Sequence, residues 1–356
     1  MTSYATDFTK LLNITYPIVQ APMAGGHTTP ALVSAVSNAG ALGGFGAAVL
    51  APEAITDGIA QIRKATDKPF VVNLFVLDPI QADEQVIARA QDRLAAARKA
   101  LNLPKPTTPT SFFEDNQAQI QAALDAAPPA VSFTFEIPDD AILRAFKKAG
   151  SIIIGTATNV KEAQAWEKAG ADALCIQGIE AGGHRGTIPR ISDERDIGIM
   201  TLIPDVAHAI SIPFVAAGGI MDGHALRAAI ELGAHGAQIG TAFLCCDESG
   251  TPEHWKNALR NAGPDSTEIT RAFSGRPARA LRTAFAKAWR EHPEDIAPYP
   301  IQNTLTRDIR KAAATQHQPD YFSYWSGQGV SRTRPMPAQK LIQTFIDEFE
   351  HPAKTR

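Results

Sequence analysis

A histidine set among glycines is the feature of this sequence with the clearest chemistry. Residues 177–186 read Gln-Gly-Ile-Glu-Ala-Gly-Gly-His-Arg-Gly and follow an apolar run that predicts a strand. Glycines let the backbone approach a flat ring or a phosphate closely, and an imidazole exchanges protons near neutral pH. A flexible surface loop is the alternative reading, and this segment alone gives both equal weight. If the loop belongs to an active site, His184 is its expected catalytic residue.

Two further glycine-containing segments follow apolar runs later in the chain. Residues 216–220 read Ala-Ala-Gly-Gly-Ile, and residues 238–242 read Gln-Ile-Gly-Thr-Ala. Both offer backbone N–H groups that no side chain covers, and Thr241 adds a hydroxyl. Together they predict a phosphate site, although either segment alone could serve only tight packing.

Small residues and amides end three other predicted strands. Residues 20–26 read Gln-Ala-Pro-Met-Ala-Gly-Gly, while Asn73 and Gln177 carry side-chain amides. An amide can both donate to and accept from the edge of a heteroaromatic ring. A phosphate site facing amides and small residues fits a phosphorylated flat cofactor, and flavin mononucleotide (FMN) fits best.

The elements that must position these residues alternate regularly. The predicted strands are 18–24, 41–47, 70–76, 130–136, 151–157, 173–178, 213–219 and 237–243. The predicted helices are 30–39, 52–66, 81–101, 139–148, 160–169, 203–209 and 223–232. Most strands are continuously apolar, as is typical of parallel strands covered on both faces.

Eight such units predict an α/β fold, a (β/α)8 TIM barrel. Active sites of such barrels lie at the C-terminal ends of the strands, and phosphate is commonly held after the last two. A doubly wound open sheet is the alternative. The strand number and the lack of a Gly-x-Gly-x-x-Gly motif between strand and helix weaken it.

The pattern changes after residue 246. Segments 253–261, 269–273 and 278–290 predict helices without strands between them, and 338–350 predicts an amphipathic helix. We therefore expect an FMN-binding barrel over residues 1–246. Residues 247–356 are expected to form a mostly helical substrate lid whose last helix packs back on the barrel. A Pro- and Thr-rich loop over 105–121 is expected before the fourth strand, covering part of the pocket.

Composition narrows the class of protein. The 356 residues are 44% hydrophobic and 20% charged, with a net charge of −3, so no basic excess indicates a nucleic-acid partner. No apolar run approaches the ~20 residues that cross a bilayer, and the N-terminus lacks a signal-peptide pattern, so we expect a cytoplasmic protein. The three cysteines show no metal-ligand spacing. The remaining histidines of note are expected on surfaces or loops: His27, His208, His224 and His235. Of these, His27 is the strongest further candidate for the site, because it follows the loop at the end of the first strand.

These segments, in this order, resemble the nitronate monooxygenase family, formerly called 2-nitropropane dioxygenases. The segments that carry the resemblance are 17–25, 73–75, 177–186, 217–220 and 238–241, with 273–279 and 327–329 in the C-terminal part. The Glu-Ala-Gly-Gly-His-Arg-Gly and Asn-Leu-Phe forms resemble the class I group. That group uses FMN and oxygen and needs no reduced nicotinamide.

The resemblance implies roles for individual residues. His184 takes the place of the family's catalytic histidine. The residues implied to bind FMN are Ala21, Pro22, Met23, Asn73, Gln177, Gly182, Gly183, Gly218, Gly219, Gln238, Gly240 and Thr241. Tyrosines lie near the substrate in the family, and the candidates are Tyr299, Tyr321 and Tyr324. Arg276, in a Ser-Gly-Arg-Pro turn, is a candidate partner for a substrate carboxylate. No metal is expected.

The resemblance also implies a reaction. Alkyl nitronates such as propionate 3-nitronate would be oxidised with O2 to a carbonyl compound and nitrite, a detoxification. His184 would stabilise the anionic substrate if protonated, or take the α-proton of a nitroalkane if neutral. Small molecules are the expected partners, without nucleic acid or membrane, and the protein would be a monomer or homodimer.

Two alternative functions stay open. One is an FMN-dependent NAD(P)H reductase of the enoyl-carrier-protein or quinone reductase type. The other is a flavin-binding or ligand-sensing protein without catalysis, against which the titratable His184 argues.

Overall fold

A closed barrel of eight parallel strands forms the centre of the protein. The computed structural model describes residues 4–351, apart from 78–82, 108, 110–111 and 113–114. The barrel strands are β1 (Ile18–Gln20), β2 (Gly43–Gly46), β3 (Phe70–Phe75), β4 (Ala130–Thr134), β5 (Ile152–Ala157), β6 (Ala173–Gln177), β8 (Phe214–Ala217) and β9 (Ala237–Ile239). Their order is β1-β9-β8-β6-β5-β4-β3-β2, and a parallel bridge from Val19 to Leu42 joins β1 to the β2 side. The predicted TIM barrel is confirmed.

Each predicted strand contains one barrel strand, but several end earlier than predicted. The first was expected to run to residue 24, whereas β1 ends at Gln20. Pro22 cannot donate to a strand ladder, and Gly25 and Gly26 both have φ of +90°. The residues beyond Gln20 therefore leave the sheet and form part of the barrel rim.

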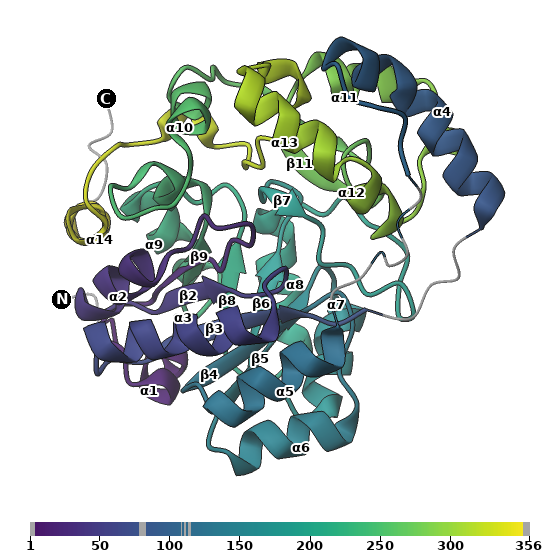
Figure 1. Ribbon diagram of the computed structural model, residues 1–356. Coiled ribbons are helices and arrows are strands. Elements are labelled where there is room, and N and C mark those ends of the chain that lie inside the picture. Colours follow the sequence, from purple (N-terminus) through teal and green to yellow (C-terminus); the bar gives the residue numbers. More distant parts are fainter. Residues whose placement is uncertain (1–3, 78–82, 108, 110–111, 113–114, 352–356) are drawn as a thin grey trace.

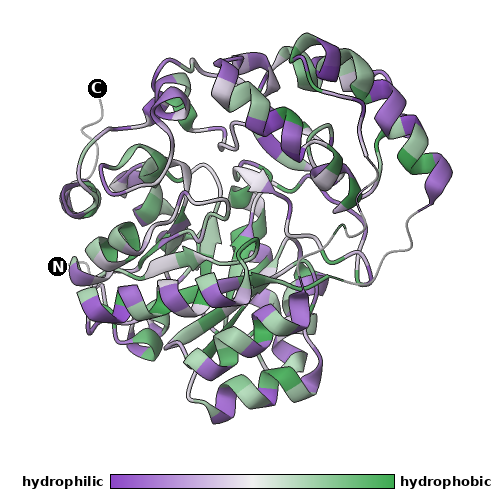
Figure 2. Ribbon diagram, in the orientation of Figure 1, coloured by the Kyte–Doolittle hydropathy of each residue, from purple (hydrophilic) through white to green (hydrophobic). Residues whose placement is uncertain are grey.

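Helices cover the outside of the barrel. They are α2 (Pro30–Asn38), α3 (Pro52–Ala65), α5 (Asn116–Ala126), α6 (Asp140–Lys148), α7 (Val160–Ala169), α8 (Ile199–Ala209), α9 (Gly223–Glu231) and α14 (Ala338–Glu350). A short helix, α1 (Asp7–Leu12), places Phe8 and Leu12 in the small apolar cluster inside the barrel. Figure 2 shows hydrophobic residues on the barrel strands and hydrophilic residues on the outer turns of the helices.

The segment before β4 differs from the prediction. Part of the expected loop 105–121 belongs to α5, which packs against α3 and β3. Asp115 begins this helix by accepting a hydrogen bond from the N–H of Ala118 at 3.0 Å, a common N-cap arrangement. Positions 108, 110–111 and 113–114 of that predicted loop lie outside the described residues, as do the first two of the predicted helix 81–101.

A second group of elements, which we call the cap, covers the C-terminal ends of the strands (Figure 1). It consists of α4 (Glu84–Ala100), α10 (Glu253–Arg260), α11 (Ala284–Arg290), α12 (Ile301–Leu305), α13 (Arg307–Gln316), β10 (Thr267–Thr270) and β11 (Ala278–Leu281). Four short 3-10 helices lie in and around it: η1 (Thr241–Cys245), η2 (Pro293–Asp295), η3 (Pro319–Tyr321) and η4 (Val330–Arg332).

The helix α4 packs on the cap and not on the barrel, although it lies between β3 and β4 in sequence. Ile87 and Leu94 join an apolar cluster with Trp289 and Ile309 of the cap. Arg98 forms an ion pair of 2.8 Å with Asp308 at the start of α13. The cap therefore draws one helix from the first half of the chain.

Two segments predicted as helices are partly strands. Residues 269–273 and 278–290 were expected to be helical, but β10 and β11 pair antiparallel, and only 284–290 are helical. A two-residue strand, β7 (Gly183–His184), pairs with the other edge of β11. This small sheet links the cap to the loop after β6.

The last helix completes the barrel wall. Helix α14 packs against α9 and α2, with Phe345 and Phe349 buried. Glu348 accepts a hydrogen bond of 2.9 Å from the N–H of Gly223 at the start of α9. The division of the chain at residue 246 stays a prediction. None of the described helices has the length and apolar composition that a bilayer crossing requires.

Candidate active site

A cavity of about 560 Å3 lies at the C-terminal ends of the barrel strands, beneath the cap. Its volume falls in the range of sites for small molecules and cofactors. His184 and Tyr299 line it together with every residue predicted to bind the cofactor. Those residues are Ala21, Pro22, Met23, Asn73, Gln177, Gly182, Gly183, Gly218, Gly219, Gln238, Gly240 and Thr241.

The backbone of His184 is held from two sides. In the β7–β11 pair, His184 lies opposite Ala278. The backbone N–H of the following residue, Arg185, donates to the carbonyl of Pro277 at 2.8 Å. From the barrel, Gln177 donates to the His184 carbonyl at 2.9 Å and accepts from the N–H of Gly186 at 2.8 Å. The imidazole is thereby fixed at the cavity wall.

The hydrogen bonds of Ser274 assign the tautomer of this imidazole. His184 Nε2 lies 2.9 Å from the hydroxyl oxygen of Ser274, a fully buried residue. That hydroxyl donates its own proton to the carbonyl of Arg276 at 3.1 Å. With the hydroxyl proton given to that carbonyl, Nε2 is the donor to Ser274 and the lone pair lies on Nδ1; this tautomer is assigned from the hydrogen-bond network.

Aromatic rings surround the imidazole. Ring centroids lie 5.2 Å away for Trp325, 5.5 Å for Tyr299, 5.9 Å for Phe135 and 6.4 Å for Phe75. Such apolar surroundings disfavour the charged form of a histidine. Trp325 was not among the predicted site residues.

Burial, together with the charges of Arg276 and Arg310, lowers the pKa of His184 from 6.5 to about 3. At neutral pH this imidazole is uncharged in the free protein. A neutral imidazole with its lone pair on Nδ1 can accept a proton from a bound molecule.

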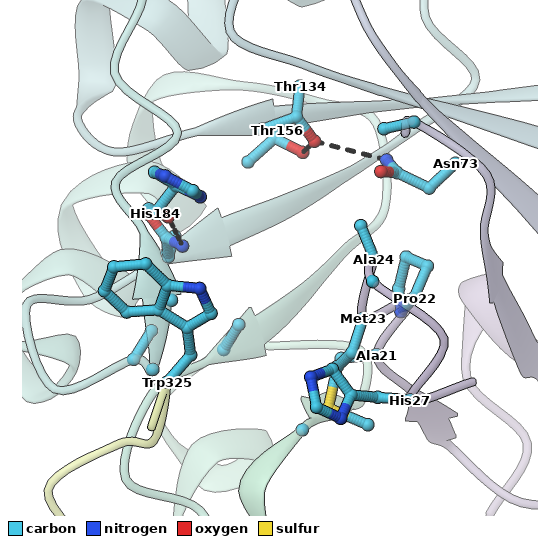
Figure 3. A pocket seen from close by; sticks show the side chains of 18 of the residues that line it. Ala21, Pro22, Met23, Ala24, His27, Asn73, Thr134, Thr156, His184 and Trp325 are labelled. Carbon is cyan, nitrogen blue, oxygen red and sulfur yellow. Dashed lines mark hydrogen bonds between the residues drawn. The ribbon is translucent and has the colours of Figure 1, made fainter. Parts of the chain in front are cut away.

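A polar floor lies across the cavity from the aromatic rings. The side-chain nitrogen of Asn73 lies 3.0 Å from the hydroxyl oxygen of Ser132 and 3.2 Å from that of Thr134. Thr134 is in turn 3.3 Å from the hydroxyl of Thr156. Figure 3 shows His184 and Trp325 on one side of the cavity and residues 21–24 on the other, with Asn73 on the same side as residues 21–24. The three hydroxyls were not predicted.

The far end of the cavity has the form of a phosphate cradle. Gly218 and Gly219 have φ of +131° and +69°, values that other residues rarely adopt, and neither carries a side chain that would cover the backbone N–H groups. Thr241 adds a hydroxyl, as predicted. These donors suit a phosphate group without a lysine.

A segment that we call the strap, residues 326–329, closes this end. The N–H of Gly327 donates to the hydroxyl of Thr241 at 2.9 Å, and the N–H of Gln328 donates to the carbonyl of Glu180 at 3.0 Å. The strap packs directly on Gly182, where an added Cβ would lie 2.5 Å from the nitrogen of Gly327. The cavity is thus bounded just beyond the cradle.

Three sequence candidates lie elsewhere. The guanidinium of Arg276 sits 3.9 Å above the ring of Phe135 and donates to carbonyls of the loop after His184, so it braces that loop. Tyr324 is buried in the apolar cluster of the cap, and Tyr321 packs on its edge. Of the predicted substrate residues, the structure brings Tyr299 to the cavity.

His27 lies in the loop after β1, as predicted, but not on the surface. This histidine is buried, lines the cavity and lies 3.0 Å from the hydroxyl of Thr251, with its ring against Trp255. Burial lowers the pKa of His27 to about 4. Its place in the loop after the first strand, the feature that set His27 apart in the sequence, is what brings it to the cavity.

The cap adds wall residues that sequence reasoning missed. Besides Trp325, these are Asn303, Arg307 and Arg310, from α12 and α13 and the segments around them. Asn303, Arg307 and Arg310 lie far from any glycine-rich segment in the sequence, so only the fold brings them to the strand ends.

An eight-stranded parallel barrel with a cavity at the C-terminal ends of its strands is the architecture of TIM-barrel enzymes. The model of the nitronate monooxygenase family matches residues 6–348, and the chain belongs to this family of flavin-dependent oxidoreductases. It is similar to a probable nitronate monooxygenase of Staphylococcus saprophyticus, at 40% identity over 97% of each chain.

Two solved structures are also similar. A nitroalkane oxidase from Streptomyces ansochromogenes has 38% identity and a TM-score of 0.89, covering 96% of this chain and 97% of that one. FabK from Thermotoga maritima has 28% identity and a TM-score of 0.75, covering 97% and 96%.

Proposed function

We propose that this enzyme oxidises alkyl nitronates, such as propionate 3-nitronate, with FMN as cofactor and O2 as oxidant, releasing a carbonyl compound and nitrite. The observation that carries the proposal is a neutral imidazole, His184, in one cavity with a side-chain-free phosphate cradle. Family membership and the similarity to a nitroalkane oxidase support it. Its role would be detoxification of small nitro compounds, in the cytoplasm, by a monomer or homodimer.

The residues present fit FMN. Gly218, Gly219 and Thr241 would hold the phosphate, while Asn73 and Gln177 would face the polar edge of the ring system. The strap ends the cavity beyond the cradle, so a monophosphate fits where the adenylate of a dinucleotide would require the strap to move. The chemistry that bound FMN supplies is acceptance of electrons from the nitronate and their transfer to oxygen.

His184 would act on neutral nitroalkanes. Its Nδ1 takes the α-proton, and the imidazolium forms beside the nitronate that the same step creates. The two new charges arise as a pair in an apolar site, where their attraction is strong. This attraction offsets the desolvation cost that keeps the imidazole neutral in the free protein. The hydroxyl of Ser274 holds Nε2 in place during the transfer.

A second candidate is an FMN-dependent reductase, and the similarity to FabK favours it. Such an enzyme would use the same barrel and cradle but would require NADH or NADPH to deliver electrons. A preformed nitronate supplies electrons itself, so the two functions differ in what they consume.

Oxygen uptake tests the proposal. We expect the purified enzyme to consume oxygen and release nitrite with propionate 3-nitronate or ethyl nitronate, without any nicotinamide. Uptake that requires NADH or NADPH would instead indicate the reductase. If the enzyme turns over neither nitronate, with or without a nicotinamide, the protein binds flavin without catalysing this reaction.

A further inference from the structure

The turn that carries Ser274 is buried in the cap. Residues 271–277 join β10 to β11, and the hydroxyl of Ser274 holds Nε2 of His184. Ala272 and Phe273, directly before Ser274, are buried, so their backbone carbonyls need hydrogen-bond partners inside the protein. Neither of these two residues lies in a helix or strand, so no regular ladder supplies the partners.

Two side chains at helix α12 supply them. Nε2 of Gln302 donates to the carbonyl of Ala272 at 2.9 Å. The hydroxyl of Thr306, the C-cap of α12, lies 2.5 Å from the carbonyl oxygen of Phe273 and 3.3 Å from that of Asn303, so its proton goes to Phe273. Gln302 and Thr306 are both fully buried, so water cannot take the place of either donor. The loss of one donor would leave a buried carbonyl unsatisfied.

The same turn packs against the segment that precedes α12. At Gly275, an added Cβ would lie 2.2 Å from the carbonyl oxygen of Ala297 and 2.6 Å from the backbone nitrogen of Tyr299. Gln302 reaches this segment as well, because its Oε1 accepts from the N–H of Ala297 at 3.3 Å. Tyr299 lines the cavity. Helix α12 therefore holds the turn of Ser274 and part of the cavity wall in one packed unit.

We propose that Thr306 and Gln302 are positioning residues, which hold Ser274 where its hydroxyl fixes the tautomer and the orientation of His184. Neither of the two is among the described residues that line the cavity. The inference rests on the proposed function and deepens it, because it names what keeps the proposed base in the form that can accept a proton. A displacement on the order of 1 Å, caused far from the reacting atoms, can lower a rate about 100-fold.

The tautomer of His184 can be measured without turnover. Histidine labelled with nitrogen-15 gives separate signals for Nδ1 and Nε2, and those of His184 are identified by their loss in His184→Asn. In the enzyme with bound FMN we expect the proton on Nε2. In Thr306→Val, which keeps the shape of the side chain but removes the donor, we expect the proton to be shared between Nε2 and Nδ1. Thr306→Ser keeps the hydroxyl and should retain the tautomer of the parent enzyme.

Turnover gives a second test. In Thr306→Val we expect kcat/KM to fall roughly 10- to 100-fold for nitroethane, which needs the base, and to stay within about threefold for ethyl nitronate. In a Ser274→Ala background, Thr306→Val should change kcat/KM for nitroethane less than about twofold, because the group through which Thr306 acts is already gone. Independent losses that multiply would overturn the proposal. Thr306→Cys, with a weaker donor, gives the same comparison at smaller amplitude if the valine variant does not fold.

Thr304→Val is the matched control. Thr304 lies on the same helix, and its hydroxyl also donates to a backbone carbonyl, that of Phe112 at 3.2 Å. That carbonyl belongs to a segment remote in sequence from the turn of Ser274. We expect this variant to keep the tautomer of His184 and kcat/KM for nitroethane within about twofold of the parent. A tautomer change in Thr304→Val as large as in Thr306→Val would overturn the assigned role.

The two tests separate this inference from the proposed function. If the parent enzyme oxidises neither nitroethane nor ethyl nitronate but Thr306→Val still shifts the proton of His184, the reaction is wrong and the positioning role stands. If the parent enzyme is active and Thr306→Val leaves the tautomer of His184 unchanged, the positioning role is rejected and the proposed function stands.

Discussion

Replacing His184 by asparagine is expected to lower the turnover of neutral nitroalkanes about a thousandfold, the range that a general base contributes. Preformed nitronates carry no α-proton to remove, so their turnover should change less than about tenfold. The measurement is kcat/KM for nitroethane and for ethyl nitronate in the variant and the parent enzyme. Because burial lowers the pKa of His184 to about 3, protonation of this residue should not reduce nitroalkane turnover between pH 8 and 5.

Ser274→Ala offers a graded comparison. It keeps the imidazole of His184 but removes the hydroxyl 2.9 Å from Nε2, so the ring can turn and the proton can move to Nδ1. We expect a partial loss with nitroethane and little change with ethyl nitronate. If His184→Asn lowers kcat/KM for nitroethane and for ethyl nitronate by the same factor, the histidine does not act as a base.

Gly182→Ala is expected to abolish cofactor binding. The added Cβ would lie 2.5 Å from the nitrogen of Gly327 and 2.6 Å from the carbonyl carbon of Ser326, and both neighbours are backbone atoms that cannot turn aside. The strap must therefore move away from Thr241, which opens the phosphate end. We expect FMN affinity to fall at least 100-fold, measured as flavin absorbance per protein after gel filtration.

A matched control is Gly263→Ala, where an added Cβ would come no closer than 3.9 Å to another residue. This variant should purify with the same flavin content as the parent. A yellow, fully loaded Gly182→Ala protein would show that the strap does not close the cofactor site.

The barrel and its glycine-rich strand ends could be predicted because their signals are local. Continuous apolar runs mark buried parallel strands, and the barrel rule then places residues 216–220 and 238–242 together. His184 was found in the same way, since it follows a strand directly. His184 and residues 217–220 and 238–241 line one cavity.

The cap could not be predicted because its elements depend on distant partners. Residues 278–281 read Ala-Arg-Ala-Leu, a sequence compatible with a helix, and become β11 through pairing with β10 and β7. The sequence of helix α4 favours a helix, but no local sequence feature indicates that this helix packs on the cap.

Dependence on distant parts of the chain also explains which site residues were missed or misplaced. Arg310 and Trp325 reach the cavity only through the cap, while Arg276, within the Ser-Gly-Arg-Pro turn, braces the loop after His184. Long-range packing, and not residue type, decides which arginine faces a ligand.

Anaerobic reduction of the flavin shows which molecule supplies electrons to this enzyme. The enzyme, purified with its bound FMN, is mixed with propionate 3-nitronate in the absence of oxygen, and separately with NADH. We predict that the nitronate bleaches the flavin absorbance at once and that NADH does not. Bleaching by NADH, with no response to the nitronate, would contradict this account.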